Sequence, residues 1–171
     1  MNQISSAPLA AAIDPALIQR ARTLSLQSKR GLVEELQQLS GVDARQVVRE
    51  LAVPFGLDVL ETADMLAMAP AFDLLPLSLA LARHSVLLRA PDGRLLGVIA
   101  DPFDLDLQTW LGARTGQGTL DVRLALLADI DAYLSKQEES VRAVDSLLPG
   151  AASDARRDGK TAAVLSFASV S

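Results

Sequence analysis

Apolar positions in the first third of the chain recur at the three- and four-residue spacing of amphipathic helices. Asp14 and Asp43 are suited to cap two of these helices, because an aspartate carboxylate accepts the unpaired amide protons of a first helical turn. A further helix is expected between them, over residues 29–39, and Gly41 is suited to end it in a left-handed conformation. The pattern predicts a helical subdomain of three short helices over residues 14–53.

Beyond residue 53 the pattern changes, and from residue 85 the spacing of apolar positions is two. Residues 85–89 and 95–100 have the composition of strands, and the Pro-Asp-Gly sequence at 91–93 is typical of a hairpin turn. Residues 120–126 alternate leucine or valine with polar residues, which predicts a half-buried third strand. Short helices are expected at about 62–69, 76–83, 104–112 and 129–136. The order strand, strand, helix, strand, helix predicts an α+β subdomain over residues 54–138, with helices on one face of a small three-stranded sheet.

Both ends of the chain lack such patterns. Residues 1–13 carry no charge and are expected to form a flexible leader. Residues 151–161 are small or charged and show no periodicity, as is typical of linkers. The apolar, serine-rich residues 163–171 have no predicted partner to pack on. The segment 139–171 is therefore interpreted as a linker toward a further domain that is absent here.

Composition excludes several classes of protein. Hydrophobic residues make up 50% of the chain and mean hydropathy is +0.26, so a core can form, and 4% aromatic content favours helix over a β-sandwich. The absence of cysteine excludes a disulfide scaffold, a thiolate zinc site and a cysteine nucleophile. The net charge is −5, and residues 51–140 hold 6 basic and 13 acidic residues, which argues against a dedicated nucleic-acid binder.

Targeting signals are also missing from the sequence. No uncharged apolar run reaches the length of about 18 residues that a transmembrane helix requires. The N-terminus has no basic segment before its apolar stretch, as a secretory signal would. We therefore expect a cytosolic location.

One short motif is similar to the end of a nucleotide-binding loop. Gly159, Lys160 and Thr161 match the last three positions of the phosphate-binding loop, in which successive backbone amides surround the phosphates. The first glycine of that loop would fall on Asp154, whose carboxylate repels phosphate. A flexible linker is the favoured interpretation of this segment.

Two other features are candidates for chemistry. Asp101, Asp104 and Asp106 cluster as divalent-cation ligands do, but the glycine and distal glutamate of a calcium loop are absent, and helix capping by Asp104 explains them better. His84 is the single histidine, and with no predicted nucleophile near it a structural role is favoured. No catalytic, cofactor-binding or metal-binding residue is therefore assigned.

Two clusters are candidates for partner binding. Basic residues gather between the first two predicted helices, and a solvated charged face is the alternative to an anion or partner patch. This cluster comprises Arg20, Arg22, Lys29 and Arg30. Met65, Leu66 and Met68 are expected in the core, with an adaptable docking surface as the alternative.

One longer stretch resembles a known family. From Leu74 to Asp106 the chain reads LLPLSLALARHSVLLRAPDGRLLGVIADPFDLD. The leucine-proline start, the Ala-Arg-His segment, the Asp-Gly-Arg-Leu turn and the Ala-Asp-Pro-Phe-Asp block together resemble the N-terminal domain of the type II secretion and type IV pilus assembly ATPases. The resemblance continues to the Asp129-Ile130 pair and covers about residues 30–136.

The resemblance implies a non-catalytic domain of a hexameric secretion ATPase (ATPase E), truncated before the ATPase core. ATP and Mg²⁺ are implied for the parent protein alone, and no cofactor is expected in this part. In the secretion branch this domain docks onto the cytoplasmic domain of an inner-membrane protein, the L component. The implied location is thus the cytoplasmic face of the inner membrane, with no nucleic-acid partner. The contact residues are unknown, and the helices of residues 14–53 are the favoured docking face.

A sister branch of this family suggests an alternative function, the binding of cyclic di-GMP. Its members use an Arg-Leu-Gly motif with a second glycine seven residues after the first. Here Gly31 and Gly41 lie ten residues apart, and taking Gly41 as the second glycine places the motif on Leu32, Val33 and Glu34. The phosphate-binding arginine is then lost and a carboxylate is gained. A third hypothesis, an independent small enzyme, has no nucleophile-base pair to support it.

Overall fold

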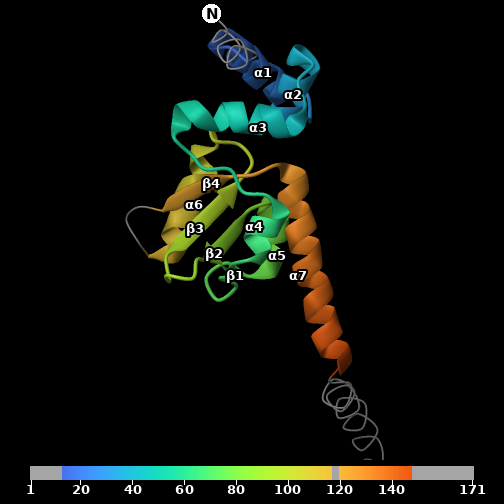
Figure 1. Cartoon of the computed structure of the whole chain (residues 1–171), viewed down its shortest axis with the longest axis vertical. Helices are drawn as coiled ribbons and strands as arrows, with labels where there is room; N and C mark the ends of the chain where they lie inside the picture. The colour runs from blue at the N-terminus through green and yellow to red at the C-terminus, as the bar shows by residue number, and fades with distance from the viewer. Residues whose placement is uncertain (1–12, 117–119, 148–171) are drawn as a thin grey trace, which may run out of the picture. The chain divides into compact units, whose positions relative to one another are not determined.

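The computed structural model describes residues 13–116 and 120–147 (Figure 1). The chain divides into two compact units, with the boundary after Leu134. The predicted leader, apart from the buried Ile13, and most of the predicted linker lie outside the described residues. Those two predictions therefore stay predictions, as does the phosphate-loop interpretation of residues 159–161.

The described residues begin with three helices, as the spacing predicts. These are α1 (Pro15–Gln27), α2 (Leu32–Ser40) and α3 (Ala44–Ala52). Asp14 accepts the Leu17 amide at 2.8 Å, and Asp43 caps α3 in the same manner. Gly41 follows α2 with a φ of 70°, the left-handed conformation expected of it. α2 begins three residues later than predicted, because Ser28 bonds to Glu35 and holds the preceding chain outside the helix.

A four-stranded sheet forms the centre of the described α+β part, in the order β1-β2-β3-β4 (Figure 1). The strands are β1 (Ala69–Pro70), β2 (Val86–Arg89), β3 (Leu95–Ile99) and β4 (Asp121–Leu124). β2 and β3 form the predicted antiparallel hairpin, with Val86 opposite Val98 and Arg89 opposite Leu95. β4 runs parallel to β3. The predicted α+β class is confirmed.

The sheet contains one strand more than the sequence pattern predicts. Ala69, expected at the end of a helix, starts β1 and pairs with Arg89, while the helix itself is shorter, α4 (Thr62–Leu66). A two-residue strand is too short to show periodicity. A single parallel bridge between Val59 and Leu124 adds a further pairing beside β4.

One 3₁₀ helix and three α-helices follow in the described residues. They are the 3₁₀ helix η2 (Val53–Phe55), α5 (Leu77–Arg83), α6 (Leu105–Thr115) and α7 (Leu127–Leu147). α6 does not stop near Gly112 as predicted, because that glycine keeps a helical conformation and the helix ends at Gly116, with a φ of 69°. α7 extends well past residue 136. None of the described helices is both long and apolar enough to cross a membrane.

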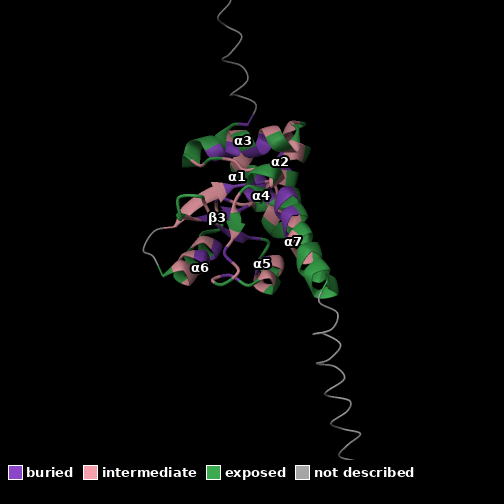
Figure 2. Ribbon diagram, turned by 60° about the horizontal axis from the view of Figure 1, so that its bottom comes forward, coloured by how far each residue is buried: buried purple, intermediate pink, exposed green. Residues whose placement is uncertain are grey.

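The core lies on both faces of the sheet, whereas the sequence predicts one covered face (Figure 2). Leu87 and Leu88 point to opposite faces, and they are 1% and 0% exposed. α6 covers the face of Gly97, where a Cβ atom would lie 2.7 Å from Leu120 Cδ2 and 3.6 Å from Leu111 Cδ1. The missing side chain of Gly97 thus leaves room for the Leu120 side chain, while Leu111 of α6 lies at an ordinary contact distance.

Gly97→Val is expected to lower the free energy of unfolding by about 1–3 kcal/mol, because its branched carbons would enter the space of Leu120 and Leu111. Urea unfolding followed by circular dichroism measures this change. Gly112→Ala is the matched control, since nothing lies within 4 Å of a Cβ there and alanine favours the helix. Equal midpoints for Gly97→Val and wild type would show that Leu120 and Leu111 do not fill the space beside Gly97 as described.

The described part of the second unit is the C-terminal half of α7, residues 135–147. Arg142 pairs with Glu138 one turn earlier, at 3.6 Å. Val141, Val144 and Leu147 are exposed on this segment. No sequence-predicted site residue falls here.

Candidate partner-binding surface

The acidic block at residues 101–106 is a tight turn that leads into α6. Asp101 accepts the amide of Phe103 at 2.8 Å, and Asp104 caps α6 by accepting the Leu107 amide at 3.0 Å. The capping role predicted for Asp104 is confirmed. Burial raises the pKa of the Asp101 carboxyl above its ordinary value. Within the described ranges, no group of three or more histidine, aspartate or glutamate side chains is placed to hold a metal ion.

Phe103 in this turn joins α1 and η2. The guanidinium carbon of Arg22, on α1, lies 4.0 Å from the centroid of the Phe103 ring. Phe55, in η2, meets the same ring edge-on, with the centroids 5.0 Å apart and the planes at 89°. Residues that are far apart in the sequence are thereby brought into one aromatic cluster.

Leu26 stands next to this cluster at the end of α1. Its side chain is 89% exposed, the highest value among the large apolar residues described. Leu26, Arg22, Phe103 and Asp101 line a hollow of about 390 Å³ between α1 and the acidic turn. We call Arg22, Leu26, Phe55 and Phe103 the α1 surface. An exposed leucine beside aromatic rings and an arginine is typical of a protein-binding surface.

The basic cluster predicted from the sequence is divided among several environments. Arg22 stacks on Phe103, whereas Arg30 pairs with Glu35 at 3.4 Å. Arg20 and Lys29 are exposed. Only Arg22 of the four thus belongs to the α1 surface.

The other singled-out residues have structural surroundings. A hydrogen bond of 2.8 Å joins His84 Nδ1 and Asp131 Oδ1. His84 also ends α5, with a φ of 47°. Met65 is fully buried, as predicted for the core, and Met68 packs partly against it, while Leu66 is 45% exposed. His84 therefore has the hydrogen-bonded structural role that the sequence favours.

Glu34, at one of the glycine-motif positions, lines a second hollow of about 520 Å³. Glu34 and Asp43 both line it, together with Gly41. Leu32, at the position of the motif arginine, is 4% exposed. The hollow thus presents two carboxylates and one arginine, Arg30, which is paired with Glu35, where a phosphate ligand would need free cations.

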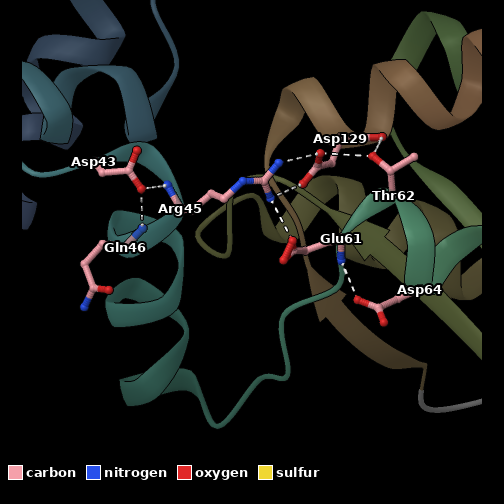
Figure 3. Close-up of polar contacts among 7 residues, drawn as sticks. All are labelled: Asp43, Arg45, Gln46, Glu61, Thr62, Asp64 and Asp129. Carbon is pink, nitrogen blue, oxygen red and sulfur yellow. Dashed lines mark hydrogen bonds and ion pairs between the residues drawn. The ribbon is translucent and has the colours of Figure 1, made fainter.

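Arg45 on α3 forms a polar network with α4 and the first turn of α7 (Figure 3). Its guanidinium donates to both Asp129 oxygens, at 2.9 and 3.2 Å, and to Glu61 at 3.1 Å. The Thr62 hydroxyl donates to Asp129 Oδ1 at 3.0 Å. These hydrogen bonds to Asp129 raise the pKa of Arg45. The four residues, which we call the Arg45 network, join the helical part to the α+β part.

Asp129→Asn is expected to lower the free energy of unfolding by about 1–3 kcal/mol, because it removes the charge that receives Arg45 and Thr62 in a mostly buried setting. The midpoint of urea unfolding measures the loss. Asp131→Asn is the control, since its pair with His84 is exposed and such pairs contribute little. A midpoint shift no larger than that of the control would mean that the Arg45 network does not stabilise the fold.

Two solved structures have a similar fold. The structure of MshE with cdg matches with a TM-score of 0.54 and 20% identity, over 75% of this chain and 96% of that chain. One crystal form of the N-terminal domain of XpsE matches with a TM-score of 0.52 and 25% identity, over 72% and 85% of the two chains. The comparison with curated protein sequences found no match. The chain is thus similar to the N-terminal region of secretion and pilus ATPases.

A comparison of the sequence with models of protein families identifies the family of this chain. Residues 55–143, about half of the chain, match the model of the MshEN domain. The chain therefore belongs to the MshEN domain family. The resemblance noted in the Leu74–Asp106 stretch, which lies within the matched residues, is confirmed.

Proposed function

We propose that this domain docks onto the cytoplasmic domain of an inner-membrane platform protein, the L component of a type II secretion system. In this proposal it tethers its parent ATPase to the membrane for protein secretion. Membership of the MshEN family and similarity to the XpsE N-terminal domain support it. The observation that carries it is Leu26, which is exposed beside the Phe55–Phe103 cluster.

The α1 surface has the features of an interface centre. Leu26 offers an apolar anchor, and Phe103 supplies a ring that is already held in place by Phe55. Arg22 is fixed on that ring, so little side-chain entropy would be lost when it meets a partner. Asp101 and the neighbouring charges form a polar rim. This placement agrees with the helical part being the favoured docking face.

The wider setting follows from the same proposal. The parent is a hexameric ATPase that binds ATP and Mg²⁺ outside this domain, and this domain itself carries no cofactor. The domain works at the cytoplasmic face of the inner membrane and reaches it through its partner. The acidic balance of residues 51–140 favours a protein partner over nucleic acid.

Isothermal titration calorimetry of the full chain against the L component's cytoplasmic domain tests the proposal. We expect saturable heat with one binding site per domain. The absence of heat at protein concentrations well above micromolar would contradict it. The same titration with a chain carrying Leu26→Lys locates the contact on α1.

Cyclic di-GMP binding is the second candidate, and one observation favours it. MshE, which shares this fold, was solved with cdg. Against it, Glu34 and Asp43 line the hollow at the glycine-motif positions, and the buried Leu32 replaces the arginine. Saturable heat on titration of cyclic di-GMP at micromolar concentration would establish this function. We expect none.

A further inference from the structure

Trp110, the single tryptophan of the chain, lies between two arginines. It is half-buried on α6, whose Leu107 and Leu111 point into the core. The guanidinium carbon of Arg83, at the end of α5, lies 4.5 Å from the centroid of the indole. That of Arg114, one turn after Trp110, lies 4.6 Å from it. We call Arg83, Trp110 and Arg114 the tryptophan–arginine cluster.

The two arginines of this cluster lack acidic partners. No carboxylate of the described residues lies within ion-pair distance of Arg83 or Arg114. Elsewhere in the described chain, arginines of the α+β part are paired: Arg89 with Asp73, Arg94 with Asp92, and Arg123 with Asp121. Arg83 and Arg114 therefore differ from these paired arginines, although the region around them has an excess of acidic residues.

Stacking on the indole leaves hydrogen-bonding capacity unused. A guanidinium stacks through its face, while its N–H groups point outward along its edge. Arg114 donates one of them to the Leu74 carbonyl at 3.1 Å, and its Nε–H group is buried with no acceptor. The exposed Arg83 makes no hydrogen bond to any of the residues that the structure describes. The ring therefore holds two cationic forks in place, each with free donors.

We propose that the tryptophan–arginine cluster is a docking site for an acidic segment of a protein partner. A guanidinium fork matches the two oxygens of a carboxylate, so the pair of arginines suits two nearby aspartate or glutamate side chains. Tryptophan and arginine are also the residue types that contribute most to binding at protein interfaces. Holding both forks on the indole lowers the entropy lost on binding.

The negative charge of this domain favours a short acidic segment over a larger polyanion as the partner. The chain carries a net charge of −5, and residues 51–140 alone, with 6 basic and 13 acidic residues, carry −7. A nucleic acid or an anionic membrane extends over a wide area and would meet these surrounding carboxylates. A short segment contacts the cluster alone. This site shares no residue with the α1 surface, so it goes beyond the docking proposed above and does not depend on it.

Fluorescence of Trp110 tests this proposal directly, because no other tryptophan contributes to the signal. The probe is a blocked hexaglutamate peptide titrated into the full chain, and the control is hexaglutamine. We expect a saturable change in emission with hexaglutamate alone. Arg83→Gln should raise the Kd about tenfold, since hydrogen bonds to charged groups contribute that much or more. Arg94→Gln changes an arginine that is also exposed but is paired with Asp92, and it should leave the Kd unchanged.

Several results would overturn the proposal. The first is no saturable change with hexaglutamate, and the second is a Kd of Arg83→Gln for hexaglutamate equal to that of wild type. An equal response to inorganic phosphate would assign the cluster to oxyanions in general, and a response to phosphatidylserine vesicles alone would assign it to membranes. Unfolding midpoints of both variants establish that any change in Kd does not come from a loss of fold.

Discussion

Leu26→Lys is expected to weaken binding to the L component's cytoplasmic domain at least about thirtyfold. Truncating or charging an anchor at an interface centre costs at least about 2 kcal/mol, or roughly thirtyfold in Kd. The side chain is 89% exposed, so the fold does not depend on it. Lysine is also a good helix former and its charge is favourable near the C-terminus of α1. Calorimetry measures binding, and circular dichroism the fold.

Leu147→Lys is the matched control for this experiment. Leu147 is likewise a leucine at the end of a helix, and it is 78% exposed on α7. The same change in charge and hydrophobicity there should leave the Kd unaltered. An equal loss with Leu147→Lys, or full binding with Leu26→Lys, would exclude the α1 surface as the contact.

Tyr133→Ala is expected to destabilise the fold by about 3–5 kcal/mol, a large share of a typical domain's stability. Tyr133 is fully buried on α7, and its removal leaves a cavity in the core. Its hydroxyl has no hydrogen-bond partner among the described residues. Tyr133→Phe, which removes only that hydroxyl, should therefore be neutral or raise stability by up to about 1 kcal/mol. Urea unfolding of the two variants separates the ring from its hydroxyl.

The same residue is expected to lower the free energy of unfolding at high pH. Burial raises the pKa of Tyr133 to about 12, above the value of about 10 in the unfolded chain. The neutral form is thus favoured in the fold, and stability is complete below pH 10 and declines as pH rises toward 12. Tyr133→Phe should reduce this decline. An identical decline in that variant would show that other groups cause it.

Local signals explain what could be predicted from the sequence. Asp14 and Asp43 cap helices, and Gly41 ends one, because each acts on backbone groups within a few residues of itself. The 91–93 turn joins β2 and β3 for the same reason. The α+β order and the family resemblance also rest on contiguous residues. β1 was not predicted, because a strand of two residues is too short to show a periodic pattern of apolar positions.

The candidate surfaces depend on contacts between distant residues, which no spacing reveals. Arg22 meets Phe103, and Arg45 meets Asp129, 84 residues further along the chain. The sequence marked Arg22 as part of a basic cluster and Asp129 as the start of a helix, but it did not indicate their partners. Trp110 is predicted only as a helical residue. Arg114 lies one turn further along the same helix, whereas Arg83 reaches the indole from the end of α5.

The measurement that tests the central claim most directly is calorimetry of the full chain with the L component's cytoplasmic domain, with cyclic di-GMP titrated in parallel. Docking predicts saturable heat with the protein partner, with an affinity that is weakened in Leu26→Lys, and no heat with the nucleotide. Heat with cyclic di-GMP and none with the protein would contradict the account and make this domain a nucleotide sensor.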